Sequence, residues 1–236
     1  MDSTRIVGVL ALVVVVATSG CIGFVTGEQP LVYEANEASV SEDATTATGY
    51  ERTLREELVV NRTVSDRRIE VHNHYARYEK YDDIAEETTG VLAVVSTHRV
   101  DVFDHTTNPY ANMSYAGILA NLTADYDTAF GDLGDARFVE NQTATVLGED
   151  ARVGVFATTT TFGGEQVEIR LYVTRVLHGD DVVLAIGGHP TKLPAGEQEL
   201  IAMLEGIEHA TDENATASER VAPLDASGSP AARPLT

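Results

Sequence analysis

Apolar side chains recur at every second position in several stretches of the chain, which is the pattern of a strand with one buried face. The clearest case is 166–178, where four apolar residues from Val167 to Val173 occupy alternate positions. The same reasoning predicts strands over 54–64, 68–78, 91–103, 136–147, 152–162 and 182–187. Residues 91–95 are apolar on both faces, so we expect them in the middle of a sheet.

Two other stretches carry apolar residues at helical spacing. Asn108-Pro109 ends the preceding strand, and Asn112 or Ser114 is expected to cap a helix. Its apolar stripe consists of Tyr115, Ile118, Leu119, Leu122 and Tyr126. A second helix is predicted over 196–209, with Leu200, Met203, Leu204 and Ile207 facing the core. A short helical turn is expected over 42–48, capped by Ser41.

Glycine-containing spacers join the later strands. Gly163-Gly164 and Gly179-Asp180-Asp181 are typical of tight hairpins, where a positive φ is needed. Strands, a helix, a meander and a closing helix follow in that order, which predicts an α+β fold with a mainly antiparallel β-sheet flanked by helices. This order is similar to that of PsbP-like domains, which implies a sandwich. We expect one domain over 42–211 and a disordered tail over 212–236, which is rich in Ala, Ser, Pro and Asp.

The N-terminus has the features of an export signal. Residues 6–17 are uncharged and mostly apolar, the length of a signal-peptide core rather than of a span of about 20 residues. Small residues then precede Cys21, the only cysteine, as in a lipobox. We therefore predict a signal peptide over 1–20, a membrane lipid on Cys21 and a flexible tether over 21–41. An uncleaved signal anchor over 6–27 is the alternative, and both place the rest of the chain at the extracellular face.

The chain is strongly acidic, with 37 Asp and Glu against 16 Lys and Arg and a net charge of −21. Such a chain repels itself in dilute salt, whereas in molar salt the Debye length falls to about 3 Å. The acids are spread along the exported part, which favours an extreme halophile over an acidic tail or linker. Together with the lipobox, this composition indicates a haloarchaeon. Nucleic acid is disfavoured as a partner because phosphate binding needs clustered Lys and Arg.

Five of the eight asparagines lie in Asn-x-Ser/Thr sequons, namely Asn61, Asn112, Asn121, Asn141 and Asn214. Glycosylation needs an exported and exposed chain, so these sites agree with the export signal. A Thr-rich chain also forms sequons by chance. We expect at least one of the five to be used.

His72 and His74 are the best-placed candidate metal ligands. Their spacing of two on a strand projects both rings from one face, with Glu70 alongside. Ile69 and Val71 mark the other face as the core side, so exposure to water without a metal is the competing interpretation. Nucleophile-elbow and phosphate-loop motifs do not occur in the sequence, so we assign no catalytic residue and no cofactor.

The chain resembles a family of uncharacterised haloarchaeal lipoproteins that share a domain of unknown function. The stretches that carry the resemblance are Thr48-Gly49-Tyr50-Glu51, Tyr78-Glu79-Lys80, Asn108-Pro109 with Met113-Ser114, Thr145-Val146-Leu147-Gly148, Tyr172-Val173-Thr174-Arg175-Val176 and 183–190. The resemblance implies a surface lipoprotein and no known activity. We expect a non-enzymatic module that binds an envelope protein or a small ligand. A metal-binding or hydrolytic module on the His72/His74 face is the alternative.

Overall fold

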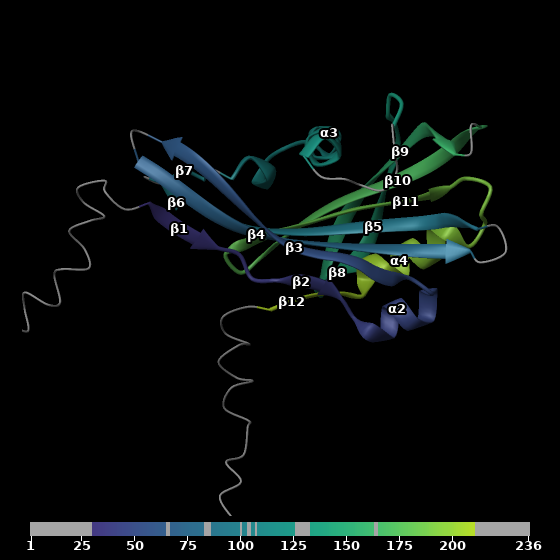
Figure 1. The fold of residues 1–236 in the computed structure, drawn as a ribbon, viewed down its shortest axis with the longest axis horizontal. Helices are drawn as coiled ribbons and strands as arrows, with labels where there is room; N and C mark the ends of the chain where they lie inside the picture. The colour runs from purple at the N-terminus through teal and green to yellow at the C-terminus, as the bar shows by residue number, and fades with distance from the viewer. Residues whose placement is uncertain are drawn as a thin grey trace, which may run out of the picture.

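The computed structural model describes residues 30–64, 67–82, 86–99, 101–102, 105–106, 108–125, 133–162 and 165–210. Within them the fold is built on an eight-stranded sheet (Figure 1). Its strands are β1 (Leu31–Glu34), β3 (Glu51–Val64), β4 (Arg67–Asp82), β5 (Glu87–His98), β8 (Arg137–Val146), β9 (Glu149–Phe162), β10 (Glu165–His178) and β11 (Asp181–Pro190). β3 forms one edge beside β4, and the order then runs β4-β5-β11-β10-β9-β8. These pairs are antiparallel, whereas β1 pairs with β4 in parallel.

Helices and short strands cover both faces of the sheet (Figure 1). On one face, which we call the α4 face, lie β2 (Ala38–Val40), α2 (Glu42–Thr48), α4 (Gly196–Glu205) and β12 (Ile207–His209). The other, the α3 face, carries η1 (Pro109–Ala111) and α3 (Tyr115–Asp125). A small hairpin of β6 (Asp101–Val102) and β7 (His105–Thr106) completes the described elements. Two apolar cores therefore fill the spaces between the sheet and its two covers.

The strand alternation sorts side chains between these two cores. On β10, Ile169 and Leu171 are buried toward α3, whereas Tyr172 and Val176 are buried toward α4. On β5 the run from Val91 to Val95 is buried on both faces, which confirms that it lies in the middle of the sheet. The prediction of a mainly antiparallel sheet flanked by helices is thus confirmed.

Local hydrogen bonds set the helix ends. Ser41 caps α2 by accepting from the Ala44 N–H at 3.3 Å, and the helix ends at Gly49, whose φ is 77°. Ser114 accepts from the Gly117 N–H at 3.2 Å at the start of α3. The predicted helix over 196–209 is wrong at its end, because α4 stops at Glu205. Residues 207–209 instead form β12, which pairs with β2, a partner that lies far away in sequence.

The prediction of a flexible tether over 21–41 is wrong from Leu31 onward. β1 pairs with β4, β2 pairs with β12, and Ala35, Ala38 and Val40 are buried. The ordered fold therefore begins by residue 31 rather than at 42. β5 pairs with β4 only as far as Ser96, and beyond that point β1 pairs with β4 in its place. The sheet, and not the local sequence, therefore determines the partner of β1. Among the described residues, none of the helices combines the length and the apolar character needed to cross a membrane.

Candidate functional site

A cleft separates the β3 edge of the sheet from the layer that covers the α4 face. Two cavities lie here, of about 580 and 480 Å³, and Arg52 lines both, so we call them together the Arg52 cleft and refer to each as one of its parts. The larger part is lined by Val40, Glu42, Thr45, Thr46, Gly49, Tyr50, Glu51, Arg52 and Tyr78. The smaller part is lined by Glu37, Ser39, Arg52, Arg55, Glu208, His209 and Ala210. Both volumes fall in the range of about 300–1,000 Å³ that is usual for ligand sites.

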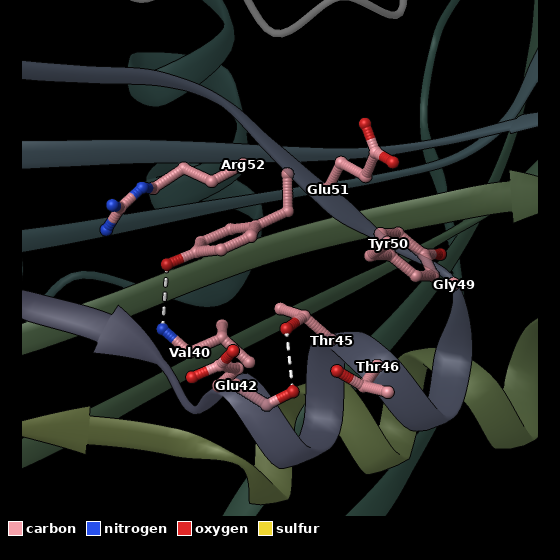
Figure 2. Close-up of a pocket in the computed structure, with 9 residues that line it drawn as sticks. Val40, Glu42, Thr45, Thr46, Gly49, Tyr50, Glu51 and Arg52 are labelled. Atoms are coloured by element: carbon pink, nitrogen blue, oxygen red, sulfur yellow. Dashed lines mark hydrogen bonds between the residues drawn. The ribbon is translucent and has the colours of Figure 1, made fainter.

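Two buried tyrosines, Tyr50 and Tyr78, line the larger part, and Figure 2 labels Tyr50. The Tyr78 hydroxyl accepts from the Val40 N–H at 2.8 Å and so ties β2 to the sheet. Tyr50 packs against Gly90, where a Cβ would lie 2.1 Å from the tyrosine oxygen. Burial, with a smaller effect of the Glu199 carboxylate, raises the pKa of Tyr50, so this hydroxyl stays protonated. At Tyr50 the floor of the cleft is therefore uncharged.

The charges of the cleft lie at its rim. Figure 2 shows Arg52 and Glu51 on β3 across from Thr45 and Thr46 on α2. Arg55 forms an ion pair with Glu37. The Arg52 guanidinium is exposed and makes no hydrogen bond or ion pair with any residue that the structure describes. It is therefore available to a carboxylate, phosphate or sulfate group, which a guanidinium binds through two parallel hydrogen bonds.

A buried polar network lies behind the wall of the smaller part. His209 points inward from β12, and its Nε2 lies 3.1 Å from the Asp181 carboxylate, whose side chain is 1% exposed. Asp181 also accepts from the Asn36 N–H at 2.7 Å and contacts His98 Nδ1 at 2.9 Å. Burial alone would raise the pKa of the Asp181 carboxyl, but the hydrogen bonds from His209, Asn36 and His98 outweigh it and lower this pKa. Asp181 is thus a buried anion held by three segments.

The geometry of this network differs from that of a hydrolytic triad. The base of a triad uses one ring nitrogen for the acid and the other for the nucleophile. Here Ser96 Oγ and Asp181 both contact Nε2 of His209, at 3.2 and 3.1 Å. Nδ1 of His209 faces Nδ1 of His178 at 2.9 Å. The arrangement therefore fixes β12 to the sheet and does not activate Ser96.

The sequence interpretation missed Asp181, which it treated as a turn residue. The hairpin prediction holds for Gly179, whose φ is 62°, but Asp181 is already the first residue of β11. Alternation along β11 places Asp181 on the same face as Val183 and Ala185, which pack in the α4-side core. That signal marks it as inward-facing, whereas its partners come from β5, β12 and the β1–β2 connection and have no local signature.

His72 lies between two carboxylates. Its Nδ1 contacts Glu57 of β3, and its Nε2 lies 2.9 Å from Glu70. The hydrogen bond to Glu57, followed by that to Glu70, raises the pKa of His72. His74 stands opposite Glu57 and Ser96 in the sheet register and is half-buried. In the part of the chain that the structure describes, no group of three or more His, Cys, Asp and Glu is placed to hold a metal ion.

Four of the five sequons lie on described, exposed residues. Asn61 is on β3 and Asn141 on β8, the two edge strands of the sheet. Asn112 follows η1. Asn121 donates its side-chain amide to the Gly117 carbonyl at 2.8 Å. The fifth sequon, Asn214, and the predicted lipidation site, Cys21, lie outside the described residues, as does the predicted tail over 212–236.

The fold is a two-faced α+β domain with a polar cleft at its edge. The chain belongs to the family described as Domain of unknown function (DUF6517), whose model matches residues 37–208. This match confirms the prediction of a family with no assigned activity. No curated protein matches the chain. Among solved structures it is similar to the solution structure of cyanobacterial PsbP (CyanoP) from Synechocystis sp. PCC 6803, with 12% identity and a TM-score of 0.32, over 75% of this chain and 93% of that chain.

Proposed function

We propose that this protein is a non-enzymatic binding module at the extracellular face of a haloarchaeal membrane, anchored by a lipid on Cys21, and that the Arg52 cleft receives an anionic group of its ligand. The ligand is an acidic segment of an envelope protein or a small anionic molecule. The observation that carries the proposal is the guanidinium of Arg52, which lies in the wall of both parts of the cleft and pairs with none of the described residues.

The charge of the whole chain sharpens this argument. A net charge of −21 repels anions at long range, and molar salt screens that repulsion beyond about 3 Å. An anionic ligand is then held by local contacts, for which a guanidinium beside a buried tyrosine floor is well suited. The alternative of a metal or hydrolytic site on the His72/His74 face has less support, since both ring nitrogens of His72 already contact glutamates.

Site-specific photo-crosslinking in the native membrane tests the cleft. Benzoylphenylalanine at Thr46, which lines the larger part, should give a discrete adduct. The adduct should be lost in Arg52→Gln and retained in Arg62→Gln, a matched change at an exposed arginine further along β3. An adduct that is indifferent to Arg52, or no adduct at Thr46, contradicts the proposal.

The anchor is tested separately. The mature protein should have the mass of a chain that begins at Cys21 and carries a lipid, and Cys21→Ala should abolish that lipidated form. If Cys21→Ala leaves the mass of the membrane-bound protein unchanged, the uncleaved signal anchor is correct instead. Neither result alters the crosslinking test of the cleft.

A further inference from the structure

A second cavity, of about 250 Å³, lies on the α4 face near the start of α4, at the other end of the sheet from Asp181. We call it the Tyr172 pocket. Its polar walls come from Glu140, Gln142, Arg170, Tyr172, His189 and Glu197. Val155, Leu193 and Pro194 add apolar surface. The volume is below the range of about 300–1,000 Å³ that drug-sized ligands occupy, so it suits a smaller molecule.

The floor of this pocket is a buried tyrosine–histidine pair. His189 is 5% exposed, and its ring stacks on Tyr172 with centroids 5.6 Å apart. His189 Nδ1 donates to the Pro190 carbonyl at 3.0 Å, so Nε2 is left to accept from the Tyr172 hydroxyl at 3.3 Å. Burial lowers the pKa of His189 and raises that of Tyr172, so both groups are neutral. The start of α4 fixes the imidazole, because a Cβ on Gly196 would lie 2.5 Å from Nδ1.

An arginine and two glutamates line the pocket around this neutral floor, and the arginine forms no ion pair with either glutamate in the part of the chain that the structure describes. Arg170 comes from β10, Glu140 from β8 and Glu197 from the first turn of α4. The Glu197 carboxylate accepts from the Gln142 amide at 2.9 Å. Arg170 forms no ion pair within 4.0 Å of a carboxylate in the described chain, although two carboxylates line the same cavity. The cation and the two carboxylates therefore line one cavity without an ion pair between them among the described residues.

We propose that the Tyr172 pocket binds a small zwitterion of α-amino-acid type. The carboxylate of the ligand pairs with Arg170, and its ammonium group pairs with Glu140 and Glu197. Its side chain rests on Val155, Leu193 and Pro194. Opposite charges line this small cavity without forming an ion pair. They are therefore complementary to a molecule that carries both charges a few ångströms apart. This site is independent of the Arg52 cleft, with which it shares no lining residue.

Saturation-transfer NMR on the full-length protein in detergent and molar KCl tests the proposal with three matched probes. L-Alanine carries both charges, propionate carries the anion alone, and propylamine carries the cation alone. We expect transfer to the methyl group of alanine and a response to each single-charge probe that is at least about tenfold weaker, since one charge-assisted contact is missing. Equal binding of propionate, binding of propylamine alone, or no transfer to alanine overturns the proposal.

Variants distinguish a loss of ligand contacts in the pocket from a general loss of folded structure. Arg170→Gln should weaken alanine binding at least about tenfold, and Glu140→Gln should weaken it as well, because each variant removes one charge-assisted contact. Arg152→Gln is the matched control, because Arg152 is exposed on β9 and faces the α3 side of the sheet. Binding by Arg170→Gln that equals the wild type, in a protein whose melting temperature is unchanged, excludes Arg170 from the site and overturns the assignment.

Discussion

At the scale of single residues, Asp181 holds together the cover of the α4 face. One carboxylate, 1% exposed, contacts Asn36 after β1, His98 on β5 and His209 on β12. A buried charge is costly unless each of its lone pairs has a donor, and here four N–H groups surround it. If the carboxylate is replaced by an uncharged amide, the four N–H donors face a group that cannot accept a hydrogen bond from each of them.

Asp181→Asn should therefore lower the free energy of unfolding by about 3 kcal/mol in denaturant titrations at molar salt. The folded-state pKa of Asp181 lies below its ordinary value of 3.8. Its contribution is then present above about pH 4 and is lost as the pH falls through the folded-state pKa, so the variant should also lose part of the acid dependence of stability. Asp180→Asn is the control, because that side chain is 78% exposed, and its change should stay within about 0.5 kcal/mol. Similar losses in both variants contradict this role of Asp181.

His72 gives the opposite pH dependence. Glu57 and Glu70 raise the pKa of His72 above its ordinary value of 6.5, so the folded protein retains this proton more strongly than the unfolded chain. The stabilisation is full below about pH 6.5 and disappears as the pH rises through the folded-state pKa. The difference in unfolding free energy between the wild type and His72→Gln should accordingly shrink from pH 6 toward about pH 8. Glu57→Gln should reduce this slope, and a pH-independent difference would show that the two glutamates do not act on His72.

At the scale of elements, the sequence predicts those strands and helices whose hydrophobic residues recur with a clear local period. The long alternating strands β9 and β10 lie close to where predicted. The doubly buried centre of β5 is also confirmed, but the strand runs from Glu87 to His98 and not over 91–103. β1, β2 and β12 have only three or four residues each. They form strands because they pair with strands that lie far away in the sequence. The same division applies to the sites. The spacing of His72 and His74 is visible in the sequence, whereas the Arg52 cleft and the Asp181 network are formed by segments that only the topology brings together.

The contact between β2 and β4 illustrates such a non-local support. The Tyr78 hydroxyl, on a residue that is 1% exposed, accepts the Val40 N–H. Tyr78→Phe keeps the ring but leaves this buried donor unsatisfied, so it should cost about 1–3 kcal/mol of stability. Amide exchange at Val40 should accelerate more than exchange within β10. Tyr81→Phe on the same strand is the control, since Tyr81 is 56% exposed, and its effect should be negligible. Unchanged exchange at Val40 in Tyr78→Phe would show that the hydrogen bond does not hold β2.

At the scale of the whole molecule, one covering layer connects the two candidate binding sites. α2 lines the Arg52 cleft, and the first turn of α4 lines the Tyr172 pocket. The two helices pack together, and Thr48 of α2 contacts the Met203 sulfur of α4 at 3.1 Å. Both proposed ligands therefore meet the same side of the protein, which carries part of an overall charge of −21.

That charge makes stability depend on salt. Carboxylates that exceed the basic groups by 21 repel one another over about 10 Å at 0.1 M salt but over only about 3 Å at 1 M. The repulsion opposes the compact state, so the melting temperature should fall as KCl is lowered from molar to 0.1 M, by roughly 10 °C if about 3 kcal/mol is lost. Sucrose at equal osmolality is excluded from the protein surface and does not screen charge, so it should restore only a small part of the loss. A melting temperature that is constant or higher at low salt would mean that the acidic surface is not balanced by salt, and the halophilic origin proposed for this chain would then lose its main support.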